Sequence, residues 1–195
     1  MTDSATNAAK VLYTPLAEAR WAYLIDPRPQ MDPDKPLAWS VDLVFPANDP
    51  KTIAFHKKLE GAFIAEHGAK KRRSDKGFPM KTDKNDAGLL VCKFKAQQLV
   101  RRDGTTAPGP KLIDAKKQPW DGSAIGNGSK LIVAFKLHAW DRPEGCGISL
   151  IPRAAQVVHY VPYLEEDATE GFEEQAGGYV VPGIADEFDE FGDDL

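Results

Sequence analysis

Residues 126–140 read GNGSKLIVAFKLHAW, a glycine-rich turn followed by an alternating run. One set of alternate positions is apolar: Leu131, Val133, Phe135 and Leu137. The intervening set is Lys130, Ile132, Ala134, Lys136, His138 and Trp140. Because successive side chains of a strand point to opposite faces, the run predicts a strand with one core face and one basic, aromatic face. The turn lacks the lysine and hydroxyl of a phosphate-binding loop, and no helix follows it, so we expect a hairpin turn with positive backbone angles.

Strands are also predicted on both sides of this stretch. Alternation or enrichment in branched and aromatic residues predicts strands at 20–25, 37–45, 89–96 and 111–114, and either one long strand or two at 147–163, interrupted near Pro152. Within 37–45 one face carries Leu37, Trp39, Val41, Leu43 and Phe45. Within 89–96, Lys93 and Lys95 share the face opposite Cys92 and Phe94.

One helix is predicted between these strands. Asp49 followed by Pro50 is a helix start, and Gly68 follows the last helical residue, His67. Apolar residues recur at helical spacing inside this range: Phe55, Leu59, Ala62 and Phe63. Several strands, turn signals and a single amphipathic helix predict a mainly β protein built on a small antiparallel five-stranded barrel.

Charge is divided unevenly along the chain. All 25 Lys and Arg residues lie at or before Arg153, and the formal net charge is -4. Residues 1–164 hold 17 acidic residues and carry +8, whereas residues 165–195 hold 12 acidic residues and carry -12. A basic body with an acidic end favours a nucleic-acid binder that carries its own competitor.

Length and composition predict one domain with two tails. We expect a disordered N-terminus at 1–10, a folded domain at 11–164 and a largely disordered acidic tail at 165–195. No apolar run approaches the roughly 20 residues that span a bilayer, and the N-terminus lacks the apolar segment of a signal peptide, so we expect a soluble intracellular protein. Cys92 and Cys146 are too few and too far apart for a disulfide framework or a zinc site, and we interpret both as buried thiols.

The sequence resembles a known family loosely over residues 11–162, most specifically over 120–162, and again in the tail. The run from Trp120 to Lys130, followed by a strand and then by residues 147–150 and 154–158, resembles bacteriophage single-stranded-DNA-binding proteins of OB fold that end in an acidic, aromatic-containing tail. The resemblance implies an OB barrel that binds single-stranded DNA in phage replication, recombination and repair, in the cytoplasm of a bacterial host. It also implies that the tail recruits the phage DNA polymerase and helicase–primase.

Two features depart from that family. The helix of a typical OB barrel follows the third strand, whereas the helix predicted at 50–67 follows the second predicted strand. An unrecognised strand or a varied topology would explain this. The chain also ends in Leu195 rather than in an aromatic residue, with Phe188 and Phe191 just inside the end.

Binding to single strands requires cations for the phosphates and exposed rings on which bases stack. The candidates on strands are Trp21, Tyr23, Lys93, Lys95, Lys130, Lys136 and Trp140. The candidates in loops or at their ends are Arg72, Arg73, Lys81, Arg101, Arg102 and Lys111. Trp39 and Phe94 are instead expected in the core.

The acidic end of the chain combines carboxylates with aromatic rings. Its candidate partner-binding residues are Asp186, Glu187, Phe188, Asp189, Glu190, Phe191, Asp193 and Asp194. Because a purely solubilising tail requires no aromatic rings, we hypothesise that this segment occupies the basic groove when DNA is absent. An end that fits its own groove also fits a neighbour's, so the same reasoning allows a homodimer with exchanged tails.

Other functions remain open at this level. The folded region shows no nucleophile elbow, no histidine–carboxylate motif and no carboxylate cluster with metal spacing, which argues against a nuclease or another enzyme. His56, His67, His138 and His159 show no ligand spacing, and we expect no metal and no cofactor. An RNA-binding or protein-binding OB module remains the alternative.

Overall fold

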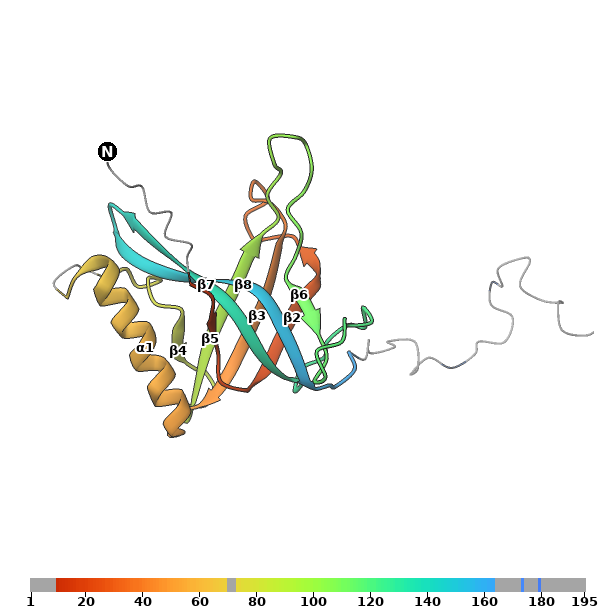
Figure 1. The fold of residues 1–195 in the computed structure, drawn as a ribbon, viewed down its shortest axis with the longest axis horizontal. Coiled ribbons are helices and arrows are strands. Elements are labelled where there is room, and N and C mark those ends of the chain that lie inside the picture. Colours follow the sequence, from red (N-terminus) through yellow and green to blue (C-terminus); the bar gives the residue numbers. More distant parts are fainter. Residues whose placement is uncertain (1–9, 70–72, 164–172, 174–178, 180–195) are drawn as a thin grey trace, which may run out of the picture. The chain divides into compact units, whose positions relative to one another are not determined.

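The computed structural model describes residues 10–69, 73–163, 173 and 179 (Figure 1). The chain divides into one unit of residues 1–164 and a second unit of residues 165–195. Of the second unit, only Glu173 and Tyr179 are among the described residues. No helix among the described residues is long and apolar enough to span a membrane.

Five strands of the first unit close into a ring. They are β2 (Ala17–Arg28), β3 (Ala38–Pro46), β5 (Leu89–Gln97), β7 (Lys130–Arg142) and β8 (Gly145–His159). Antiparallel pairs join β2 to β3, β3 to β5, β7 to β8 and β2 to β7. The ring is completed by β5 and β8, which run parallel, with Phe94 opposite Leu150.

This closed ring confirms the predicted barrel, with one difference at the β5–β8 junction. The sequence predicts an antiparallel barrel, but a closed ring with an odd number of strands cannot alternate direction at every junction. One parallel pair is therefore unavoidable in a five-stranded barrel. The structure places that pair where Phe94 meets Leu150, between strands far apart in the sequence.

Three short strands extend this sheet. Strand β1 (Leu12–Tyr13) pairs with β7, β4 (Met80–Thr82) pairs with β5, and β6 (Lys111–Ile113) runs parallel to β8. The strands β1 and β4 span two and three residues, too few to produce a readable period. Because β1 lies outside the ring, α1 follows the second ring strand, β3, and precedes the third, β5, so the predicted departure from typical OB topology is present in the structure.

The helix α1 (Pro50–His67) begins and ends where the sequence predicts. The Asp49 side chain accepts a hydrogen bond from the Lys51 N–H at 2.9 Å, and the N–H of Gly68, whose φ is 77°, donates to the Ile64 carbonyl. Its inner face buries Phe55, Leu59 and Phe63. The Phe55 ring packs against Phe45 and Phe135, so the helix is fixed to the barrel core.

The barrel core follows the predicted alternation closely. On β3, β5 and β7 the buried inner side chains are Val41, Leu43, Phe45, Cys92, Phe94, Leu131, Val133 and Phe135. Strands β2 and β8 add Leu24, Ile148 and Leu150. Trp39 is also buried, and its indole N–H donates to the Ile25 carbonyl. Leu37 lies outside β3 and is exposed, so its predicted place on that face is wrong. Cys92 and Cys146 are buried and form no disulfide, as predicted.

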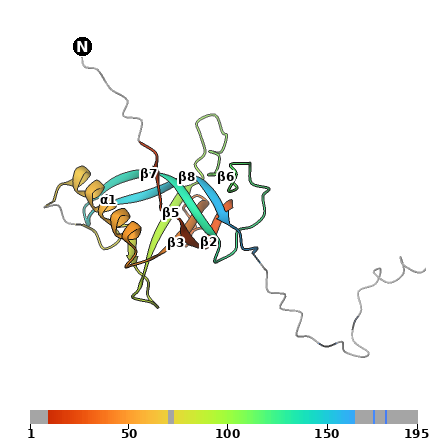
Figure 2. The same ribbon diagram turned by 60° about the horizontal axis from the view of Figure 1, so that its bottom comes forward.

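The two longest strands form a hairpin that projects beyond the barrel. The end of β7 and the start of β8 extend toward α1 in both views (Figures 1 and 2). His67 at the end of the helix makes a 2.9 Å hydrogen bond with the Gly147 carbonyl, which ties the hairpin to α1. The predicted interruption near Pro152 is a register shift inside one continuous strand. This projection supplies one wall of the groove described next.

Candidate nucleic-acid interface

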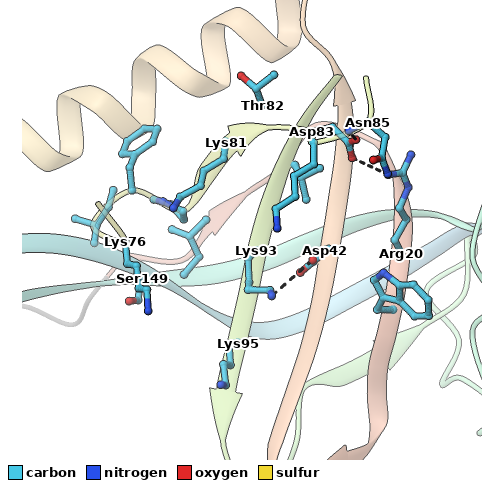
Figure 3. A pocket seen from close by; sticks show the side chains of 17 residues that line it. Arg20, Asp42, Lys76, Lys81, Thr82, Asp83, Asn85, Lys93, Lys95 and Ser149 are labelled. Carbon is cyan, nitrogen blue, oxygen red and sulfur yellow. Dashed lines mark hydrogen bonds and ion pairs between the residues drawn. The ribbon is translucent and has the colours of Figure 1, made fainter. Parts of the chain in front are cut away.

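A continuous groove crosses the outer face of the barrel. One hollow of about 650 Å³ lies over β2, β3, β5 and the loop after β4 (Figure 3). A second hollow of about 760 Å³ lies beside the β7–β8 hairpin. The two hollows share Lys76, Lys95 and Ser149, so they form one groove rather than two sites.

The groove is basic. Its basic side chains are Arg20, Lys76, Lys81, Lys84, Lys93, Lys95 and Arg142. Its acidic side chains are Asp42, Asp75, Asp83 and Glu144. Seven cations against four carboxylates leave an excess of positive charge, which suits a polyanion.

Strand register lines up the polar residues of the groove floor. Arg20 on β2 lies opposite Asp42 on β3, which lies opposite Lys93 on β5. Two residues further along β5, Lys95 lies opposite Ser40. Lys93 and Lys95 project from the same side of β5 because they are two residues apart (Figure 3). The predicted pairing of these two lysines on one outer face is confirmed.

A β-bulge places a tryptophan beside this floor. Between the pairs Arg20–Asp42 and Tyr23–Ser40, β2 has one more residue than β3. The extra residue allows two consecutive side chains, Arg20 and Trp21, to line the same groove. The residue Trp21 is 59% exposed. A cation and an exposed ring therefore stand side by side at this end of the groove.

A second indole lies at the other end of the groove, on the hairpin. The Trp140 indole N–H donates to the Ser149 Oγ at 3.0 Å, and the Arg142 guanidinium lies 5.3 Å from the ring centroid. The ring rests on the backbone of Gly147, where a Cβ atom would lie 2.4 Å from Cζ2 of Trp140. Trp140 is half-buried, so its orientation is fixed while part of the ring lines the groove.

The backbone of Trp21 leads to a stability prediction. Its φ is 53°, in the left-handed region that costs residues other than glycine about 1–2 kcal/mol. We expect Trp21→Gly to be about 1 kcal/mol more stable than Trp21→Ala, the reverse of the usual order in strands. Urea unfolding of the two variants measures this difference. A more stable alanine variant would contradict the left-handed assignment.

Burial and neighbouring charges shift three pKa values in the groove. Burial raises the pKa of Asp42, and the Lys93 ammonium offsets part of that rise. Burial lowers the pKa of Lys95, and the charges of Lys93 and Lys35 lower it further. Hydrogen bonds from the Asn85 and Asp86 N–H groups lower the pKa of Asp83, and Arg20 adds to this effect. The surroundings of the Asp42 carboxylate therefore disfavour its negative charge.

Asp42 provides a test of the electrostatics. Asp42→Asn should tighten binding of a polyanion severalfold, because it removes a negative charge beside Lys93, whose Nζ lies 3.7 Å from the carboxylate. A raised pKa in the folded state means that ionisation opposes folding. The wild type should therefore lose stability relative to the variant as the pH rises from below the ordinary Asp value through the raised pKa of Asp42.

The measurements for Asp42 are affinity and the free energy of unfolding as functions of pH. Asp34→Asn is the matched control, because Asp34 is exposed and outside the groove. It should leave the affinity near that of the wild type. If Asp42→Asn bound the polyanion no more tightly than the wild type, the prediction that the Asp42 carboxylate weakens binding would be wrong.

The structure brings together five of the predicted binding residues. Trp21, Lys81, Lys93, Lys95 and Trp140 all line the groove. The remaining described candidates do not line it: Tyr23, Arg73, Arg101, Arg102, Lys111, Lys130 and Lys136. Arg72 and the tail candidates 186–191, 193 and 194 lie outside the described residues.

Arg73 has a packing role that the sequence analysis did not anticipate. Its guanidinium donates to both carboxylate oxygens of Glu60, at 3.0 and 2.7 Å. The same guanidinium lies 4.6 Å from the centroid of Phe63 and 4.5 Å from that of Phe78. These contacts of the Arg73 guanidinium with one carboxylate and two rings anchor its loop to α1.

Sequence reasoning missed several groove residues: Arg20, Lys76, Lys84 and Arg142 among the cations, and Asn85 and Ser149 among the polar groups. Strict alternation places Arg20 and Trp21 on opposite faces, and only the bulge brings them together. Lys76 belongs to the charged run after α1, a composition typical of phosphate-binding or solvated loops. The groove position of Arg142 depends on the closure of the β7–β8 hairpin.

Comparison with known proteins identifies the fold. No family model matches this sequence, and no curated protein matches it. Among solved structures, the chain has the fold of bacteriophage single-stranded-DNA-binding proteins. The predicted family resemblance is thus confirmed at the level of the fold.

Two of these structures define the similarity. The structure of gp2.5, a single-stranded DNA binding protein encoded by bacteriophage T7, matches 88% of this chain and 98% of its own, with 23% identity and a TM-score of 0.57. The single-stranded DNA-binding protein from bacteriophage Enc34, in complex with ssDNA, matches 80% of this chain and 89% of its own, with 9% identity and a TM-score of 0.61.

Proposed function

We propose that this protein binds single-stranded DNA in the basic groove and thereby coats and protects it during phage DNA replication, recombination and repair. The observation that carries the proposal is one continuous basic groove lined by an indole toward each end, Trp21 and Trp140. The similarity in fold to phage proteins that bind single-stranded DNA supports the same proposal.

The groove supplies both parts of sequence-independent recognition. The ammonium groups of Lys76, Lys93 and Lys95 can follow the phosphates, and the exposed rings can stack on bases, each ring contributing roughly 1–3 kcal/mol. Every base has a flat face, so stacking needs no particular sequence. Binding of this kind makes and breaks no covalent bond, so the proposed role is not enzymatic.

Fluorescence titration with homopolymeric single-stranded DNA, duplex DNA and RNA tests the proposal. We expect tight binding and strong tryptophan quenching with single-stranded DNA, with much weaker binding to the duplex, because paired bases cannot stack on the indoles. The affinity should fall steeply with salt as cations are released from the DNA. Tighter binding to RNA than to DNA would favour the RNA-binding alternative instead.

For the tail, we propose that residues 185–195 compete with DNA for the groove and recruit the phage DNA polymerase and helicase–primase. The support is chemical: six carboxylates and two phenylalanines resemble the charges and rings of a single strand. Truncation after Ile184 should tighten binding to single-stranded DNA most at low salt, where the competition is strongest. Unchanged affinity at several salt concentrations would contradict it.

A matched tail variant separates charge from length. Replacing the six acidic residues of 186–194 with their amides, and keeping Phe188 and Phe191, should reproduce most of the truncation effect if charge drives the competition. Affinity purification of the polymerase and helicase–primase with full-length and truncated protein tests recruitment. Light scattering of the same two proteins tests the homodimer with exchanged tails, which should be lost on truncation.

A further inference from the structure

Trp21 adopts a conformation that a tryptophan rarely adopts without support. Its φ of 53° lies in the left-handed region, and it occupies the irregularity between Arg20 and Tyr23 in β2. A bulky residue keeps such a conformation only when surrounding contacts impose it. A bulge also leaves the backbone groups of its extra residue without ladder partners. Something outside the β2–β3 ladder must therefore hold this residue.

That contact comes from the turn before β7. The backbone N–H of Trp21 donates to Oδ1 of Asn127 at 2.8 Å, across 106 residues of sequence. Two backbone hydrogen bonds flank it: Ala19 N–H to the Ser129 carbonyl at 2.7 Å, and Gly128 N–H to the Ala19 carbonyl at 3.1 Å. The three bonds join the bulge to one side of the turn.

Contacts with the chain after β8 hold this turn in place independently of the bulge. Ser129 is fully buried, and its Oγ accepts a hydrogen bond from the Val161 N–H at 3.0 Å. Gly126 lies so close to the chain after β8 that a Cβ atom there would be 2.4 Å from the Pro162 carbonyl oxygen. Gly128 has a φ of 90°. A rigid turn thus presents the Asn127 side chain to the bulge.

We propose that Asn127 is a positioning residue that holds Trp21 in the left-handed conformation and so turns its indole into the groove to stack on a base. This inference rests on the proposed binding of single-stranded DNA. Asn127 acts through the backbone of Trp21 and need not touch the DNA. Its amide oxygen satisfies the N–H that the bulge exposes, and without it the bulge can relax and the ring can leave the groove.

The first experiment observes the ring without DNA. Protein labelled with 5-fluorotryptophan should give four ¹⁹F signals, one for each tryptophan, and Trp21→Phe identifies the signal of Trp21. Asn127→Ala should shift or broaden that signal and leave the other three in place. Asn127→Asp keeps an acceptor oxygen at Oδ1 and should keep the wild-type signal. Asn48→Ala is the control, an exposed asparagine outside the groove.

The second experiment is a double-mutant cycle in affinity for an oligo-dT strand. Removing the stacking ring with Trp21→Ala should weaken binding about tenfold. Asn127→Ala should weaken binding about threefold or more when Trp21 is present, and by less than about twofold in the Trp21→Ala background, because a positioning residue has nothing left to position. Asn48→Ala should match the wild type.

The outcomes separate this inference from the proposed function. An unchanged Trp21 signal in Asn127→Ala overturns the positioning role, whether or not the protein binds DNA. Equal losses of affinity in both backgrounds overturn it as well, because Asn127 would then act independently of the ring. If the wild type does not bind oligo-dT, the proposed function fails and the stacking role fails with it.

Discussion

Replacing Lys93 and Lys95 together with glutamine should weaken binding to single-stranded DNA by about tenfold to a hundredfold at low salt. Both ammonium groups project from one side of β5 into the groove, and Lys95 lies where the two hollows meet. Each lost phosphate contact on a single strand should lower the slope of log affinity against log salt by about 0.7, so the double variant should lower it by about 1.4. Titrations at four or five salt concentrations give both quantities.

The matched control uses two lysines of the same chain outside the groove. Lys111 on β6 and Lys130 at the start of β7 are exposed and line neither hollow. Lys111→Gln with Lys130→Gln removes the same net charge, and we expect a change of less than about twofold with the slope retained. Equal losses from the two double variants would show that net charge, rather than the groove, governs binding.

Gly147→Ala should lower the free energy of unfolding by about 2–3 kcal/mol, an effect typical of overpacking at a site without free space. A Cβ atom at this position would lie 2.4 Å from Cζ2 of Trp140 and 2.5 Å from the Cα of Gly77. Backbone on one side and a ring held by Ser149 on the other leave little room for relaxation. Chemical denaturation monitored by circular dichroism measures the loss.

The same substitution should also reduce DNA binding where the variant remains folded, because the displaced Trp140 lines the groove. Gly61→Ala is the control: nothing lies within 4 Å of the Cβ position on this exposed face of α1. It should raise stability by about 0.5–1 kcal/mol, since alanine favours a helix more than glycine does. A Gly147→Ala variant as stable as the wild type would contradict the close packing of the hairpin on Gly77.

The fold could be predicted from the sequence where an element is long enough to show a clear hydrophobic period or has clear end signals. The period-two runs of β3, β5 and β7 assign the core faces, and Asp49 and Gly68 fix both ends of α1. The two-residue strand β1 carries no such pattern. The parallel junction between β5 and β8 follows from ring closure, which is a property of the whole barrel and of no single segment.

The groove could be predicted only in part, for the same reason. Lys93 and Lys95 are evident from strand periodicity, because both neighbours on β5 face the core. Arg20 is not, because alternation places it on the face opposite the candidate ring of Trp21, and only the bulge after Arg20 brings both to one face. Arg73 shows what charge alone leaves out: its charge predicts binding, and in the folded protein Glu60 and two rings engage its guanidinium.

We expect a single strand of DNA to occupy the groove between Trp21 and Trp140. The most direct test follows the four indole N–H signals in ¹H–¹⁵N spectra during titration with oligo-dT. We expect the signals of Trp21 and Trp140 to move, whereas those of buried Trp39 and half-buried Trp120, which line neither hollow, stay in place. Movement of Trp120 alone, or binding that leaves both Trp21 and Trp140 unmoved, would contradict it.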